Sequence, residues 1–150
     1  MNIKKRILKL GIFLVLSFAG LMVVANTLSY KQTSCKYRPE SKYIWIKFDN
    51  GVQEKGVRFV SDGVIFDSSI IGRTYAKDYP DITRVAYGKG KGGLGLLTVE
   101  FMEGGQLERE KVGNIDEQCW KNLKTLLAAN PLSRKIEIFD EGGASRQSLN

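Results

Sequence analysis

The chain has 150 residues, a size that suits a single globular domain, and its 43% hydrophobic content is ordinary for one. Four of its 23 basic residues lie within the first nine residues. The part beyond Ala25 carries 19 basic and 16 acidic residues, a net charge of +3. This weak, interspersed charge argues against a nucleic-acid-binding surface, and the absence of histidine excludes Ser-His-Asp triads, Cys-His pairs and histidine-ligated metals.

The first 25 residues combine a basic start with an apolar run. Lys4, Lys5, Arg6 and Lys9 are followed by residues 10–25, which are all apolar or small. A helix of these 16 residues would cover about 24 Å, less than the roughly 30 Å of a bilayer core, and the run ends in small residues of the kind that signal peptidase reads. Residues 1–25 therefore predict a cleaved signal peptide or an uncleaved membrane anchor. In both cases the following chain lies on the extracytoplasmic or periplasmic side of the cytoplasmic membrane.

The chain has two cysteines, Cys35 and Cys119. In an oxidising compartment a disulfide between them is expected, and two buried free thiols are the alternative. Two cysteines are too few ligands for a structural zinc site, so no metal is expected. Residues 26–41 show no apolar periodicity and are predicted to be a linker.

Alternating side chains predict that the first strand begins at Tyr43 and ends at Phe48. Ile44, Ile46 and Phe48 would fill the core, which leaves Tyr43 and Trp45 on the opposite face. These two aromatic rings are a candidate interaction surface for another protein or a bilayer interface. The alternative is a sheet that is buried on both faces.

Six further strand segments follow with no helix between them. They are separated by turn sequences rich in Gly, Asp and Pro. The segments span residues 57–60, 64–66, 70–76, 82–87, 96–102 and 106–112. The sequence therefore predicts about seven antiparallel strands.

Residues 88–95 form the glycine-rich sequence GKGKGGLG, which contains the spacing GxGxxG. A dinucleotide fingerprint turns from a strand into a helix, whereas this loop leads into a predicted strand, so we interpret it as a hairpin connection. Lys89, Lys91, Gly90 and Gly92 nevertheless form a candidate ligand site for an anion, a phospholipid head group or a carboxylate-bearing partner. Solvated lysines on a flexible connection are the alternative.

One amphipathic helix follows the strands. Asn114 and Glu117 have the spacing of a capping box, Asp116 suits the first turn, and Asn130 with Pro131 ends the helix. The apolar stripe consists of Ile115, Cys119, Trp120, Leu123, Leu126 and Leu127. We interpret the tryptophan of this stripe as a core anchor.

About seven antiparallel strands followed by a helix with a Trp near its start resemble the layout of bacterial pleckstrin-homology-like (PH-like) domains. The resemblance covers residues 42–130 and is most specific over residues 96–129. It implies an α+β fold in which the helix caps a bent sheet or partly closed barrel, and members of this family bind lipid head groups, peptides or proteins. The domain would span residues 42–139, including a short edge strand at 135–139, and residues 140–150 would form a disordered tail.

No catalytic signature is present. The acid pairs Glu108 with Glu110 and Asp78 with Asp81 have the character of solvated surface charge. The sequence therefore predicts a non-catalytic, exported or membrane-tethered binding or assembly module that needs no cofactor and contacts a protein or a membrane surface. A small periplasmic or secreted inhibitor or immunity-type protein is the alternative, and a small hydrolase is the third reading. Retention of residues 1–25 would favour the tethered module.

Overall fold

The computed structural model describes residues 29–68 and 73–141. In these residues the chain forms strands, one α-helix and short 3-10 turns. The strands are β1 (Lys31–Arg38), β2 (Tyr43–Asp49), β3 (Glu54–Phe59), β4 (Gly63–Ser68), β5 (Arg73–Asp78), β6 (Ile82–Lys89), β7 (Leu94–Glu103), β8 (Gln106–Asp116) and β9 (Glu137–Asp140). The helix is α2 (Glu117–Ala129), and the turns are η1 (Pro39–Ser41), η2 (Tyr79–Asp81), η3 (Lys91–Gly93) and η4 (Pro131–Ser133).

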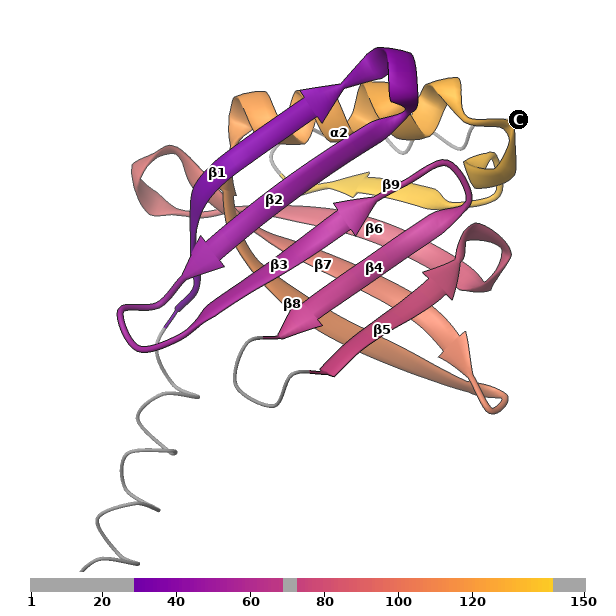
Figure 1. Cartoon of the computed structure of the whole chain (residues 1–150), viewed down its shortest axis with the longest axis horizontal. Coiled ribbons are helices and arrows are strands. Elements are labelled where there is room, and N and C mark those ends of the chain that lie inside the picture. The colour runs from indigo at the N-terminus through magenta and orange to yellow at the C-terminus, as the bar shows by residue number, and fades with distance from the viewer. Residues whose placement is uncertain (1–28, 69–72, 142–150) are drawn as a thin grey trace, which may run out of the picture.

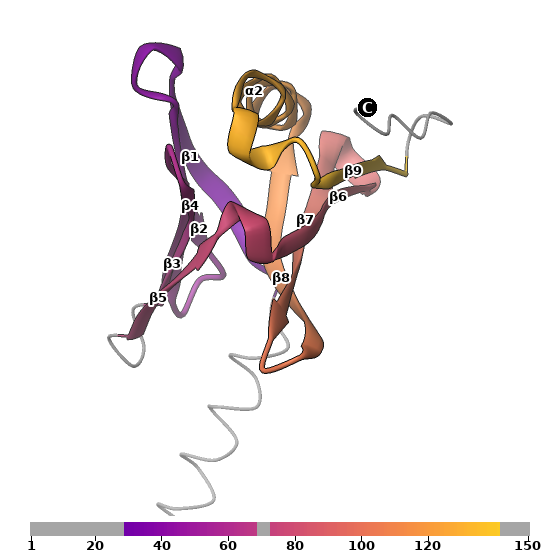
Figure 2. The same ribbon diagram turned by 90° about the vertical axis from the view of Figure 1, so that its right-hand side faces the viewer.

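The strands join one nine-stranded sheet in the order β5-β4-β3-β2-β1-β8-β7-β6-β9. Neighbouring strands are antiparallel except for β1 with β8 and β6 with β9. The parallel contact of β1 with β8 has a single paired position, Lys31 opposite Asn114. Figure 2 shows the result: β1 to β5 form one layer, β6 to β9 form the other, and α2 lies over one end of the gap between them.

The core fills the space between the two layers. The predicted alternation of β2 is confirmed, because Ile44, Ile46 and Phe48 are fully buried. Leu97 and Val99 face them from β7 and are also fully buried. In Figure 1, α2 runs across the top of both layers, so its apolar stripe closes this end of the core.

The strand count predicted from the sequence is wrong. The sheet has nine strands and is mixed, whereas about seven antiparallel strands were expected. The additional first strand, β1, lies inside the predicted linker 26–41, where Cys35 and Tyr37 are the side chains that pack against the core. A register shift between Gln32 and Ser34 interrupts the alternation of this strand, so a regular strand period is confined to residues 35–38. The ninth, β9, corresponds to the expected edge strand and pairs in parallel with β6.

The helix begins later than its sequence predicts. Its N-cap is Asp116, whose carboxylate accepts a hydrogen bond from the Cys119 amide at 2.7 Å. Asn114 and Ile115 belong to β8 instead, although Ile115 is buried as expected. The remaining stripe residues are buried, and the helix ends at Ala129, as predicted.

Residues 1–28 and 142–150 lie outside the described residues. The predicted targeting segment and nearly all of the predicted tail fall there. Among the residues that are described, no helix is both long and apolar enough to cross a membrane.

Candidate functional site

The outer face of β2 carries the aromatic pair identified in the sequence. Tyr43 and Trp45 are both half-buried and point away from the core. Across the sheet, Trp45 lies opposite Lys36 of β1 and Arg58 of β3. Trp45 therefore lies within the layer, with a strand on either side, and not at an open edge.

Two lysines approach the indole of Trp45. The Nζ atom of Lys47 lies 4.4 Å from the ring centroid, and that of Lys36 lies 5.6 Å from it. Arg38 is the cross-strand neighbour of Tyr43. The three cations are exposed, and none forms an ion pair with another described residue. We call this group, Tyr43, Trp45, Lys36, Arg38 and Lys47, the Trp45 surface.

A shallow pocket of about 270 Å³ adjoins the Trp45 surface. It lies beside Trp45 and Lys47 and reaches Gly56 and Asp67. A Cβ atom at Gly56 would lie 3.2 Å from the indole nitrogen of Trp45, so the glycine leaves room for the ring to lie over β3. Asp67 is held at the far side of the pocket by Arg58, whose Nε and Nη2 atoms each lie 2.9 Å from a carboxylate oxygen.

Lys55 of β3 also lines the pocket. Its ammonium group contacts the carbonyl oxygen of Lys111 at 3.1 Å and lies 4.1 Å from the centroid of the Tyr30 ring. Burial lowers the pKa of Lys55, and the nearby carboxylate of Glu110 opposes this shift. This lysine is therefore partly buried against β8 and Tyr30 and does not belong to the exposed cations around Trp45.

The glycine-rich loop is the β6–β7 hairpin, as predicted. The amide of Gly90 donates to the carbonyl of Leu94 at 2.9 Å, and Gly92 has a positive φ of 75°. Lys89 is not a free cation, because its Nζ atom lies 3.2 Å from a carboxylate oxygen of Glu117 on α2. The side chain of Lys91 lies outside the described residues. The ion pair therefore ties Lys89 to α2, and the anion site at this loop stays a prediction.

The predicted disulfide between Cys35 and Cys119 is confirmed. It joins β1 to the first turn of α2, with Cα atoms 6.0 Å apart. Cys119 is buried, as its place on the helix stripe predicts, but Cys35 lies on a strand of the sheet, where a linker was predicted. An oxidising compartment is compatible with this bond.

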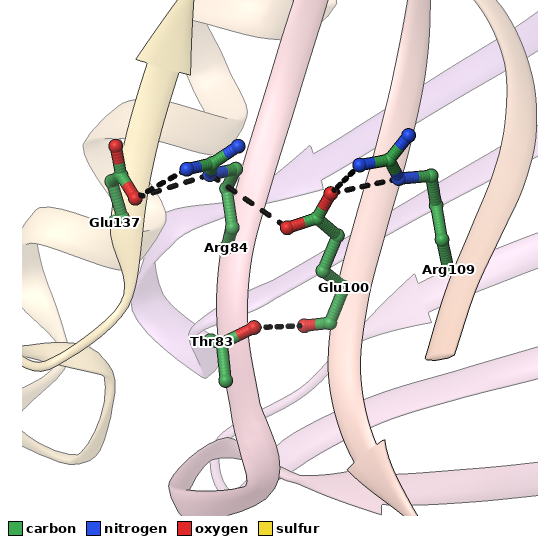
Figure 3. A network of polar contacts seen from close by, with 5 residues as sticks. All are labelled: Thr83, Arg84, Glu100, Arg109 and Glu137. Carbon is green, nitrogen blue, oxygen red and sulfur yellow. Dashed lines mark hydrogen bonds and ion pairs between the residues drawn. The ribbon is translucent and has the colours of Figure 1, made fainter. Parts of the chain in front are cut away.

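A different polar arrangement occupies the outer face of the second layer (Figure 3). Glu100 of β7 is 6% exposed and lies between two arginines, with Arg109 Nε at 2.7 Å and Arg84 Nε at 3.7 Å from its carboxylate oxygens. Arg84 also contacts Glu137 of β9 at 2.9 Å. The charges alternate in sign across four neighbouring strands, so each charged group has a partner of opposite charge. We call this row, Glu137, Arg84, Glu100 and Arg109, the Glu100 ladder. Among residues 29–68 and 73–141 no group of acidic residues and cysteines could hold a metal ion.

Sequence reasoning identified Tyr43 and Trp45 but missed Lys36 and Arg38, because both lie in the supposed linker. The alternation of Cys35 and Tyr37 with these cations was the available signal. The Glu100 ladder left no signal, since it depends on the register of four strands.

Comparison with known proteins adds no relative. No protein-family model matches the chain, and no curated protein matches it. The candidate function therefore depends on the geometry described above.

Proposed function

We propose that this protein is a non-catalytic binding or assembly module, exported or tethered outside the cytoplasm, that contacts an acidic protein through the Trp45 surface. The observation that carries the proposal is a half-buried tryptophan between two lysines that have no carboxylate partner among the described residues.

This arrangement has the character of an interface anchor. Tryptophan and arginine are enriched at binding hot spots. The backbone of Trp45 lies in the sheet between β1 and β3, which holds the residue in place. Lys36, Arg38 and Lys47 would lose no internal ion pair when a partner's carboxylates approach. Complementary charge speeds association and selects the partner, so an acidic protein surface fits this face best.

The disulfide supports a location in an oxidising compartment. A bonded cysteine pair is compatible with an oxidising compartment, and the predicted targeting segment would bring the domain there. Tethering by an uncleaved segment would suit an assembly module. A processed, diffusing domain with the same surface would suit the inhibitor or immunity-type alternative.

We also propose a relationship to PH-like domains. It is supported by two antiparallel meanders, β1 to β5 and β6 to β8, followed by a helix that covers one end of the gap between them. The additional strands and the parallel pairings are departures from the expected layout.

The direct experiment is site-specific photo-crosslinking in native envelopes. A photoreactive residue in place of Lys47 should crosslink to one acidic protein, and Trp45→Ala or the double variant Lys36→Glu/Lys47→Glu should abolish the product. The matched control is Arg134→Glu/Lys135→Glu, which reverses two exposed charges near η4 and should leave the product intact.

Three outcomes of this experiment are informative. A protein product that the Trp45 surface variants remove supports the proposal. Crosslinking to lipid alone would replace the protein partner by a membrane surface. Products that are equal in Trp45→Ala and in the unaltered protein would refute a role for this surface.

A further inference from the structure

A second pocket lies far from the Trp45 surface. It has a volume of about 200 Å³ and lies between the end of β6, the first turns of α2 and the end of β9. Its walls are formed by Tyr87, Lys89, Trp120, Lys121, Lys124 and the carboxylates of Glu117 and Asp140. Figure 2 places these elements on the β6–β9 side of α2, whereas the Trp45 surface belongs to the opposite layer.

Tyr87 gives this pocket an unused hydrogen-bond donor. The residue is 2% exposed, yet its hydroxyl has no hydrogen-bond partner among the described residues. Buried hydroxyl groups are costly when they are left unpaired, so such a group points to an acceptor from outside the chain. Burial raises the pKa of Tyr87, with Glu117 adding to the effect, and the hydroxyl therefore keeps its proton at neutral pH.

The tyrosine ring is fixed in this position. It stacks on the indole of Trp120 with ring centroids 5.2 Å apart and an angle of 16° between the planes. On its other side it lies across Gly95 of β7, where a Cβ atom would approach the ring to 2.4 Å. A side chain at residue 95 would push the ring away, so the glycine and the tryptophan together hold the hydroxyl at the pocket.

Within the described part of the chain, one cation of the pocket forms no ion pair. Lys89 pairs with Glu117 at 3.2 Å, and Lys124 lies 3.4 Å from Asp140, whose carboxylate also accepts from the indole nitrogen of Trp120 at 2.9 Å. Lys121 lines the same pocket and forms no ion pair with a described residue. Three lysines against two carboxylates give a net charge of +1.

We propose that this pocket binds a singly charged oxyanion, which accepts hydrogen bonds from the Tyr87 hydroxyl and the Lys121 ammonium. A carboxylate and a phosphodiester each offer one negative charge and two terminal oxygens. A doubly charged phosphate monoester fits less well, because Glu117 and Asp140 would repel its second charge. The proposal does not depend on the Trp45 surface, which shares no residue with the pocket.

The test uses the two indole N–H signals of the 15N-labelled protein, isolated with its disulfide intact. Acetate and dimethyl phosphate are titrated at constant ionic strength, with acetamide as the uncharged control. The signal of Trp120 should shift and saturate with at least one anion, while acetamide leaves it unchanged. The signal of Trp45 is an internal control and should not move. Phosphatidylglycerol vesicles, compared with phosphatidylcholine vesicles, distinguish a lipid source of the phosphodiester from a soluble one.

Two variants separate a ligand site from a structural contact. Tyr87→Phe removes only the hydroxyl, so it should weaken binding about tenfold. It should not lower the melting temperature of the ligand-free protein, because the lost hydroxyl has no partner among the described residues there. Lys121→Ala should weaken binding by a similar factor, whereas Lys135→Ala, which removes an exposed lysine outside the pocket, should have no effect. The absence of a saturable shift with either anion, or equal affinity in Tyr87→Phe, would overturn the proposal.

Discussion

The two outer faces of this domain use charged residues in opposite ways. On the second layer, the Glu100 ladder places Glu137, Arg84, Glu100 and Arg109 on four neighbouring strands, and every charge meets one of opposite sign. On the first layer, Lys36 and Lys47 flank Trp45, and neither forms an ion pair with a described residue, although Asp67 lies in the adjoining pocket and pairs with Arg58. The ion pairs of the Glu100 ladder connect neighbouring strands to each other, whereas the lysines of the Trp45 surface remain available to a binding partner.

Loss of the disulfide should have the largest effect on stability. The bond connects α2 to β1, the strand that carries Lys36 and Arg38 of the Trp45 surface. Breaking Cys35–Cys119 releases a loop of 84 residues, which should lower the free energy of unfolding by about 4 kcal/mol. Denaturation curves with and without reductant measure this loss. For the control variant Cys35→Ser/Cys119→Ser, which has no disulfide to reduce, the two curves should coincide. Identical curves for the unaltered protein, or two free thiols per chain after isolation, would contradict the prediction.

Of the two faces, the one with the Glu100 ladder should lose more stability when its charged residues are replaced. Arg84→Met/Arg109→Met leaves the buried Glu100 carboxylate without a partner, and the cost should be about 3 kcal/mol. Adding Glu100→Met removes that unpaired charge and should restore most of the stability. Urea denaturation of the double and triple variants tests both statements. A triple variant as unstable as the double would show that the loss comes from packing.

The connection between the layers should respond to alkaline pH. Tyr79 in η2 is buried, its hydroxyl donates to the carbonyl of Val60 at 2.8 Å, and burial raises its pKa above the ordinary 10.0. A raised pKa stabilises the fold fully below pH 10 and progressively less above it, so the free energy of unfolding should fall by about 1.4 kcal/mol over the next pH unit. Tyr79→Phe lacks this titration. Its stability should be lower near neutral pH, since it loses one hydrogen bond, but flatter above pH 10.

The Trp45 surface should lose less stability than the Glu100 ladder when its charges are changed. Lys36→Glu/Lys47→Glu breaks no ion pair with a described residue but removes two cation–π contacts with Trp45, so it should lower the free energy of unfolding by about 1 kcal/mol. Thermal melting provides the comparison with the arginine variants of the Glu100 ladder. A loss as large as theirs would mean that the two faces do not differ in the way described.

Local sequence patterns predicted the elements whose periodicity is unbroken. Strand β2 and the buried stripe of α2 follow from side-chain spacing, and the disulfide follows from the cysteine count and the predicted compartment. Strand β1 was missed because its bulge interrupts the alternation, and its place in the sheet depends on pairing with β2 and β8. Both pockets and the Lys89–Glu117 ion pair depend on contacts between distant segments, for which no local pattern exists.

The disulfide also decides how the domain would carry a mechanical load. Tension applied between Tyr30 and Glu141 would run along β1 only as far as Cys35, cross the sulfur bridge to Cys119 and leave through α2 and β9. The 84-residue loop would lie outside the path of the force, and an extension of roughly 290 Å, at about 3.5 Å per residue, would be withheld until the bond is reduced. Strands β2 to β8 lie within this loop and are therefore shielded from a pull that would detach the N-terminal end of β1.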